Sequence, residues 1–312
     1  MSLDPHIIKS YQSSQFSKAS KSYDQVAHVQ DVMAKQLLAC LLSKLEMDSA
    51  EQLSRSNSLK HTSIFVSTMQ GNDAIGPIKS SHQSMPYTSN RYVLELGAGT
   101  GICTASLLRH LAPHFSHYIV SDLSFQMMQA NRCLAQVQGR AVMDACVPAL
   151  KRAHLVVSNA MVQWIPNLTD HFSSIYSLLE PGCIYVCTGF GSKNLFPLYE
   201  ELAQVGVSRK YQPMHSLEQI EDSATLSGLN LLRYTEWFYE QEFSSVLSLL
   251  QQIKMLGAGG SPEGIKISRK QIQALEKNWS FLSPTGQVRA RWQPWLGVFQ
   301  KPLAEVSNPK NK

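Results

Sequence analysis

The chain has 312 residues, 44% of them hydrophobic and 16% charged, and a formal net charge of +5. This length and hydrophobic content are enough for one large α/β domain, or for a domain with a substantial insertion or lid. No apolar run approaches the ~20 residues of a membrane span, and residues 1–15 carry no apolar signal segment, so we expect a cytoplasmic protein without a membrane anchor. The modest charge permits an acidic partner, whereas the absence of a dense basic stripe argues against nucleic acid.

Six cysteines are scattered through the predicted helices and strands, and none forms a C-x-x-C pair. In such positions cysteine more often packs as a small apolar residue. We therefore expect neither a disulfide framework nor a metal site.

Residues 1–46 carry apolar side chains at helical spacing, including Val26 and Leu37. This pattern predicts one or two amphipathic helices before the first strand. The aromatic residues Phe16 and Tyr23 belong to this segment, and the plainest interpretation is that these helices pack on the edge of a sheet.

Residues 47–90 differ in composition. Serine recurs, and Gly71-Asn72-Asp73, Gly76-Pro77 and Met85-Pro86 interrupt any regular element. A connection this long without regular structure is uncommon inside a compact domain, so we expect a flexible surface excursion without chemistry.

A strand, a tight loop and a helix are predicted from Tyr92 onward. The apolar run 92–96 meets glycines at 97, 99 and 101, after which apolar residues recur at helical spacing. Glycines remove every Cβ from such a loop, so that its backbone can approach a ligand near the positive end of the following helix. This arrangement predicts a nucleotide-type ligand.

The spacing of the glycines separates two classes of ligand. A dinucleotide fingerprint would place its third glycine at position 102, which is Ile102. The pattern Glu95-x-Gly97-x-Gly99-x-Gly101 instead resembles the first motif of class I S-adenosylmethionine-dependent methyltransferases. The resemblance implies that Glu95 lies near the amino group of the cofactor's methionine moiety and that the loop, including Ala98, lies against the cofactor.

A second predicted strand, 117–124, carries Asp122 near its end. A carboxylate at the carboxyl tip of the second strand can accept both ribose hydroxyls of a nucleoside. The alternative is that Asp122 caps the helix predicted at 125–135, and one side chain could do both. We assign Asp122 and the neighbouring Leu123 to the cofactor.

Two further strands end in polar candidates. The third, 139–145, ends at Asp144-Ala145, and the class resemblance places such an acid at the adenine amino group, whereas a turn residue is the alternative. The fourth, 154–160, leads into 161–168. Since ligands of open α/β sheets bind beyond the carboxyl ends of the strands, four further candidates are Ser158, Asn159, Gln163 and Trp164.

Strands alternate with helices through the strand predicted at 183–191, which indicates a doubly wound, mostly parallel, seven-stranded α/β sheet of the Rossmann-like class I methyltransferase type. A helical insertion at 193–223, a strand at 228–242, a helix at 243–256 and a last strand at 288–299 follow. The expected domains are an N-terminal helical lid (1–46), the serine-rich excursion (47–90), a cofactor-binding core (91–192), a substrate- and carrier-binding insertion with closing strands (193–300) and a tail (301–312).

Several segments resemble the malonyl-acyl-carrier-protein O-methyltransferases of biotin synthesis, over nearly the whole chain except 47–90. The most discriminating are Ser158-Asn159-Ala160-Met161-Val162-Gln163-Trp164 and Leu250-Gln251-Gln252-Ile253-Lys254-Met255-Leu256-Gly257-Ala258. Two departures stand out: His154 replaces a usual Asp, and Arg291-Trp292-Gln293-Pro294 replaces a T-Y-x-V type run.

The resemblance implies methyl transfer from S-adenosylmethionine to the free carboxylate of a malonyl thioester. Such a carboxylate is already ionised at neutral pH, so no general base is required, and catalysis reduces to positioning and desolvation. Phe16 and Tyr23-Asp24 would form a lid over the cofactor. The residues assigned to catalysis are Tyr23, Gln163 and Trp164.

A cation would distinguish malonyl from acetyl groups. Arg289 and Arg291 alternate with apolar residues and therefore fall on one face of the last strand, and Lys254 is the other candidate. The carrier protein is expected to be acidic. Its docking face would comprise Lys193, Arg209, Lys210, Lys266, Arg269 and Lys270.

Other functions remain open at this point. A quinone C-methyltransferase or a small-carboxylate O-methyltransferase would share the cofactor site, and a methyltransferase-like assembly factor would bind a partner protein instead. Residues 159–162 lack the N-P-P-[YF] pattern of amino-methylating DNA enzymes. The carrier of the malonyl group and the oligomeric state stay undetermined.

Overall fold

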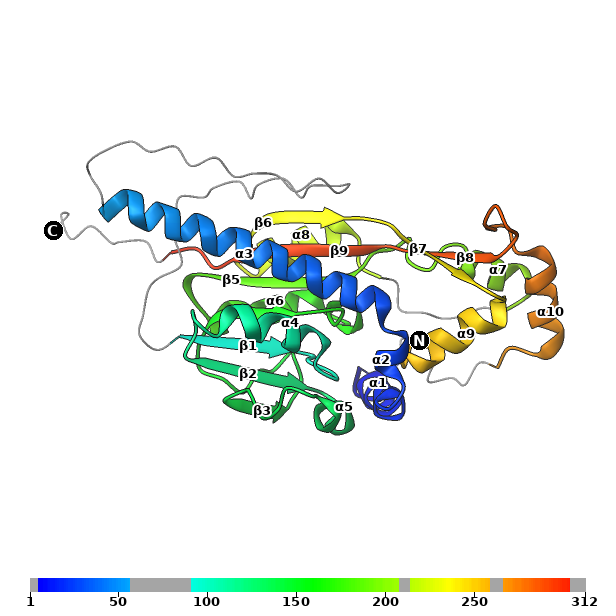
Figure 1. Ribbon diagram of the computed structural model, residues 1–312, viewed down its shortest axis with the longest axis horizontal. Coiled ribbons are helices and arrows are strands. Elements are labelled where there is room, and N and C mark those ends of the chain that lie inside the picture. The colour runs from blue at the N-terminus through cyan, green and yellow to red at the C-terminus, as the bar shows by residue number, and fades with distance from the viewer. Residues whose placement is uncertain (1–4, 57–90, 208–213, 259–265, 304–312) are drawn as a thin grey trace.

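The computed structural model describes residues 5–56, 91–207, 214–258 and 266–303. Figure 1 labels its elements in chain order. The helices are α1 (Pro5–Ala19), α2 (Tyr23–Val26), α3 (His28–Ser56), α4 (Ile102–Leu111), α5 (Phe125–Ala130), the 3₁₀ turn η1 (Val162–Trp164), α6 (Leu168–Leu178), α7 (Leu198–Gln204), α8 (Leu217–Leu226), α9 (Val246–Met255) and α10 (Arg269–Asn278). The strands are β1 (Tyr92–Leu96), β2 (His117–Asp122), β3 (Gly139–Val142), β4 (Ala153–Ser158), β5 (Leu179–Phe190), β6 (Asn230–Glu236), β7 (Tyr239–Phe243), β8 (Val288–Trp292) and β9 (Pro294–Gln300).

Seven strands form one sheet in the order β3-β2-β1-β4-β5-β9-β6. The strands from β3 to β5 run parallel, and β9 is antiparallel to both of its neighbours. Every residue of β4 is buried, as expected for a parallel strand that is covered on both faces. The predicted doubly wound, mostly parallel, seven-stranded sheet is confirmed.

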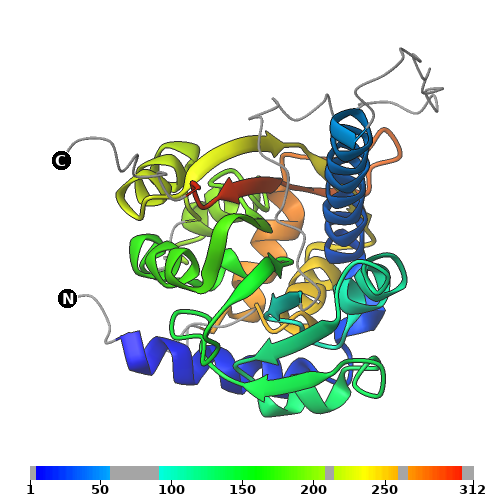
Figure 2. The same ribbon diagram turned by 90° about the vertical axis from the view of Figure 1, so that its left-hand side faces the viewer.

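Helices cover the sheet on both faces, so that the molecule has three layers (Figures 1 and 2). On one face, α3 and α4 bury Leu37, Leu41 and Leu107 against the strands. On the other face, α6 and α8 form a second core that includes Phe172 and Ile220. Both layers leave the carboxyl ends of β1, β2 and β4 free for a site.

The N-terminal segment divides into two parts with different roles. Helices α1 and α2 lie at the carboxyl ends of the strands, whereas α3 packs along the sheet beside α4 (Figure 1). Helix α3 runs past residue 46 to Ser56, so part of the predicted excursion 47–90 is helical. The rest of it, 57–90, lies outside the described residues. No helix in the described part of the chain is both long and apolar enough to span a bilayer.

The strands predicted at 228–242 and 288–299 are each split between two sheets. Strands β6 and β9 belong to the large sheet, whereas β7 and β8 form a separate two-stranded sheet. The break falls at Gln293, whose N–H bonds to the Asn194 side chain and whose carbonyl accepts from Gly191. Pro294 then has no N–H to donate. The chain therefore changes sheet at this point.

The small sheet closes a third core together with α7, α9 and α10. This core continues the sheet at the end where α1 and α2 lie (Figure 1). Helix α10 was not predicted from the sequence, and its beginning is marked by a reciprocal capping box between Ser268 and Gln271. The predicted helical stretch 193–223 contains α7 and most of α8, which runs on to Leu226, and 208–213 between them lies outside the described residues.

Candidate cofactor site and adjoining cavity

A first cavity of about 110 Å³ lies at the carboxyl ends of β1, β2 and β4, beneath α1 and α2. Most of the residues that the sequence assigned to the cofactor line it. They are Phe16, Tyr23, Gly97, Gly99, Asp122, Leu123, Asp144, Ala145 and Asn159, together with Trp164.

The glycine loop adopts backbone conformations that favour glycine at each of its three positions. The φ angles of Gly97, Gly99 and Gly101 are +67°, +54° and +92°. A Cβ at Gly97 would come 2.6 Å from Cγ of Met161, and one at Gly101 would come 2.5 Å from the Asn131 Oδ1. The loop therefore keeps its backbone open toward the cavity, as the sequence pattern predicts.

The Asp122 carboxylate ties two backbone turns together. Its Oδ2 accepts the N–H of Gly99 at 2.9 Å, and its Oδ1 accepts the N–H of Ser124 at 2.7 Å. Burial raises the pKa of Asp122, although the backbone N–H groups oppose the shift. The cap of α5 is Ser124, which accepts from Met127, so Asp122 is not the capping residue.

The Glu95 side chain points away from the first cavity. Its Oε2 accepts from the Tyr118 hydroxyl at 2.8 Å beneath α4. Burial raises the pKa of Glu95 to about 7, against hydrogen bonds from Tyr118, Thr104 and Cys103 that lower it. Four of the predicted cofactor residues do not line the cavity, namely Glu95, Ala98, Gly101 and Ser158.

Asp144 is held by a residue far away in the sequence. Its Oδ2 lies 2.5 Å from the Lys9 ammonium of α1, and its Oδ1 accepts the N–H of Cys146 at 2.9 Å. Burial alone would raise the pKa of Asp144, but Lys9 and the Cys146 N–H outweigh it and lower the pKa. Asp144 therefore presents an ionised carboxylate at the cavity wall.

The α1–α2 segment is fastened over the cavity by polar contacts. Asp24 accepts from the Thr100 hydroxyl at 2.5 Å and forms an ion pair with Arg132. The Ser17 hydroxyl lies 2.9 Å from that of Ser124. These contacts join the segment to the turns after β1 and β2, so α1 and α2 cover the cavity and α3 does not.

These groups fit S-adenosylmethionine, the cofactor that the glycine pattern implies. The open glycine backbone can lie against it, the Asp122 carboxylate can accept ribose hydroxyls, and Asp144 can accept an amino group. The loop tied to Asp122 keeps these positions fixed relative to one another.

Residues that were not selected from the sequence also line the first cavity. Met143 and Ala160 each adjoin a predicted residue at the end of a strand, and that position is the signal that could have found them. Lys9 and Gln12 carried no such signal, because the place of α1 is set by tertiary packing. The other three unselected residues of the wall are Met127, Met161 and Ile165.

A second, smaller cavity adjoins the first and shares Phe16, Tyr23 and Trp164 with it. The Phe16 and Trp164 rings meet edge to face at 5.2 Å between centroids. Burial and the nearby Asp122 carboxylate raise the pKa of Tyr23, so its phenol stays protonated. Gln163 also lines this cavity, so the three predicted catalytic residues lie together.

The far wall of the second cavity is mostly apolar and comes mainly from the insertion. It is formed by Phe190 at the end of β5 and by Asn194, Leu195, Met214, Ile253, Leu256, Ala258 and Trp292. Among the described residues, no Asp, Glu, His, Lys or Arg side chain lines it. The described part of its wall therefore offers no general base to a bound group.

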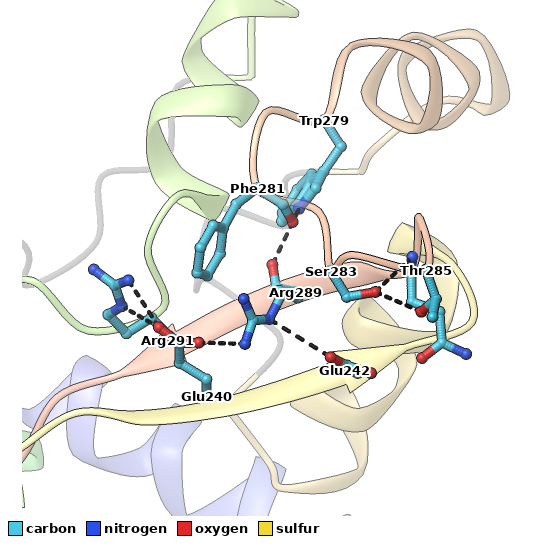
Figure 3. Close-up of polar contacts among 9 residues, drawn as sticks. Glu240, Glu242, Trp279, Phe281, Ser283, Thr285, Arg289 and Arg291 are labelled. Carbon is cyan, nitrogen blue, oxygen red and sulfur yellow. Dashed lines mark hydrogen bonds and ion pairs between the residues drawn. The ribbon is translucent and has the colours of Figure 1, made fainter.

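The predicted substrate cations lie elsewhere, which corrects that expectation. Figure 3 shows Arg289 and Arg291 directed at Glu240, with nitrogen–oxygen distances of 2.6 and 2.7 Å. Both do share one face of β8, but the opposite face, which carries Trp292, is the buried one. Lys254 is exposed on α9 and lines neither cavity.

Comparison with known proteins gives consistent likenesses. A family described as "Methyltransferase domain" matches residues 94–185. A malonyl-acyl-carrier-protein O-methyltransferase of Ilyobacter polytropus is 29% identical over 191 residues, which cover 59% of this chain and 70% of that protein. Its namesake in Halalkalibacterium halodurans is 25% identical, with 84% of this chain and 87% of that protein covered. A solved structure from Bacillus halodurans, described as a methyltransferase, has a TM-score of 0.50 at 13% identity and covers 70% of this chain and 95% of that one.

Proposed function

Since the chain is a class I S-adenosylmethionine-dependent methyltransferase, we propose that its methyl acceptor is the free carboxylate of a malonyl thioester. The malonyl group would be carried on acyl carrier protein or on coenzyme A. The product, a malonyl methyl ester, would prime pimeloyl synthesis for biotin. The names of the curated relatives support this acceptor.

The observation that carries the proposal is that the described residues of the second cavity include no base. No carboxylate, imidazole or amine among the described residues lines it, and Tyr23 stays protonated. Methylation of a phenol, or of a quinol carbon, requires removal of a proton. A carboxylate with a pKa near that of Asp or Glu is already ionised and requires none.

The chain's own residues would position the acceptor and exclude water. When bound, the cofactor supplies an electrophilic methyl group. An ionised carboxylate acceptor could take up that methyl group without transfer of a proton. Phe16, Tyr23 and Trp164 stand between the two cavities, where they would hold the acceptor in line and keep its carboxylate unsolvated.

Exposed cations on the insertion would receive an acidic carrier protein. Lys193, Lys266, Arg269 and Lys270 are exposed there, whereas Arg209 and Lys210 lie outside the described residues. Charges of this kind accelerate the encounter of two proteins and lose their effect as salt is added.

The direct test is mass-spectrometric detection of methyl transfer from S-adenosylmethionine. Malonyl-carrier protein, malonyl-coenzyme A, acetyl-carrier protein, a free small dicarboxylate and a quinol are supplied in parallel. We expect the malonyl thioesters alone to gain a methyl group. Transfer to the free acid or the quinol would overturn the proposal, and cofactor binding without any transfer would favour a methyltransferase-like assembly factor.

A further inference from the structure

Three side chains that line the second cavity each contain a buried polar atom without a hydrogen-bond partner in the described part of the chain. The atoms are Oε1 of Gln30, Oε1 of Gln163 and Nε1 of Trp292. The three side chains are only 6%, 6% and 3% exposed. Buried polar groups are nearly always satisfied in native proteins, so three unpaired atoms around one cavity indicate that a ligand pairs with them.

The surroundings of each side chain determine whether it can donate or accept a hydrogen bond. The Trp292 ring packs against Phe190 at 5.7 Å between centroids, and its indole N–H can only donate. The Gln30 backbone is held by Asn159, which donates to its carbonyl at 3.0 Å, but no bond holds its carboxamide. The Gln30 side chain can therefore turn its N–H groups toward a ligand at no loss of a bond.

The Gln163 carboxamide, in contrast to that of Gln30, is held in one orientation. Its Nε2 donates to the Ala160 carbonyl at 2.5 Å, so its Oε1 stays available as an acceptor without a partner among the described residues. The unpaired groups of the cavity are thus one fixed donor, one adjustable carboxamide and one fixed acceptor, beside the Tyr23 and Asn194 side chains that also line it. The cavity has a volume of only about 30 Å³, whereas a single water needs about 10–15 Å³, so it has room for a group of about carboxyl size.

We propose that Trp292 and Gln30 are the specificity-determining residues of the acceptor site and bind the acceptor carboxylate through neutral N–H groups. This inference rests on the proposed function. The acyl group of a malonyl thioester offers only acceptors, so the donor complementary to Gln163 is an amide N–H of the arm that carries it. The site is therefore suited to a carboxyl-terminated acyl thioester on an amide-containing arm.

Neutral donors suit this reaction better than a guanidinium would. The carboxylate loses its negative charge as the ester forms. A fixed cation would stabilise the fully charged acceptor more than the partly neutralised transition state, and would thus raise the barrier. A site with neutral donors can therefore function while Arg289 and Arg291 are paired to Glu240 outside the cavity.

The test measures binding of malonyl- and acetyl-coenzyme A by calorimetry in the presence of saturating S-adenosylhomocysteine. Trp292→Phe removes the N–H and keeps most of the ring packing, and Gln30→Met removes the amide at similar size. Trp295→Phe is the matched control, because its Nε1 is equally buried and unpaired but lies outside both cavities. Arg291→Ala tests the guanidinium alternative.

We expect Trp292→Phe and Gln30→Met each to weaken malonyl binding about tenfold, as for the loss of one hydrogen bond to a charged group. Binding of acetyl-coenzyme A and of S-adenosylhomocysteine should stay within about twofold, as should all affinities of Trp295→Phe. Unchanged malonyl affinity in both cavity variants, or loss of malonyl preference in Arg291→Ala alone, would overturn the inference and leave the proposed function standing. A wild-type chain that binds S-adenosylhomocysteine but no malonyl thioester and methylates none would overturn both.

Discussion

The Asp122 carboxylate shows how one side chain organises the edge of a sheet. It accepts N–H groups from Gly99 and Ser124, which belong to the turns after β1 and β2. The same two carboxylate oxygens therefore hold both turns in place and present an ionisable group at the cavity wall. The remaining lone pairs of these oxygens are available to ribose hydroxyls.

Replacing Asp122 by Asn should weaken cofactor binding with little effect on folding. The carboxamide has one acceptor oxygen, so it cannot keep both backbone bonds and the ribose as well. We expect the dissociation constant of S-adenosylhomocysteine, measured by calorimetry, to rise about 10- to 100-fold. Asp222→Asn, on the exposed surface of α8, is the matched control. An equal affinity in both variants would remove Asp122 from the site.

Glu95 should make stability fall as the pH rises. Its pKa of about 7 in the folded chain lies above the ordinary value near 4.5, so the folded state binds the extra proton between these two pH values. Stability contributed by that proton is present below about pH 4.5 and lost as the pH passes 7. Between pH 4.5 and 8, the free energy of unfolding of the wild type should fall by at most about 3 kcal/mol relative to that of Glu95→Gln.

Urea unfolding of both proteins across this pH range measures the effect. The difference between wild type and variant cancels other titrations, including that of buried His171, whose pKa falls to about 4 because of burial. A pH-independent difference would show that Glu95 does not titrate in this range.

At the scale of elements, α1 and α2 form a cover that is fastened at a few points. Asp24 bonds to Thr100 beside the glycine loop and to Arg132 after α5. The edge-to-face contact of Phe16 with Trp164 joins α1 to the turn after β4. Because Tyr23 lies on this segment, the cover also sets the boundary between the two cavities.

Asp24→Asn should loosen this cover. Loss of the ion pair weakens the attachment to Arg132, and we expect backbone amides of α1 and α2 to exchange hydrogen about three- to tenfold faster with S-adenosylhomocysteine bound. Hydrogen exchange read by mass spectrometry gives the result. Asp31→Asn, which removes an exposed pair with Lys35 on α3, is the control. Equal exchange in the two variants would argue against a fastened cover.

At the scale of the whole molecule, the insertion places cations on the side of the protein where α9 and α10 extend the sheet. Lys266, Arg269 and Lys270 are exposed at the beginning of α10 (Figure 1). We expect an acidic carrier protein to dock at these cations.

Lys270→Glu should raise the KM for malonyl-carrier protein about three- to tenfold at low salt and leave that for malonyl-coenzyme A unchanged. The effect should fade as salt screens the charges. Lys151→Glu, an equally exposed change before β4 at the opposite ends of the strands, controls for net charge. If the KM for malonyl-carrier protein changed neither with Lys270→Glu nor with ionic strength, docking at α10 would be contradicted.

The sequence alone determined the parallel sheet, the glycine loop and the placement of Asp122 and Asp144. These features depend on local spacing. Apolar runs, alternate glycines and an acid at the end of a strand can each be recognised within a window of about ten residues. The carboxyl ends of parallel strands necessarily meet at one edge, so the positions of the ligand-facing residues followed from the order of elements.

Only the tertiary structure decided which side chains complete the site. Alternation correctly placed Arg289 and Arg291 on one face of a strand, but it cannot tell which face meets the cavity, and the buried face carries Trp292. Lys9 reaches Asp144 across 135 positions, a contact that no local pattern encodes. Local spacing fixes the backbone of an element, whereas the packing of one element on another fixes which of its faces is buried.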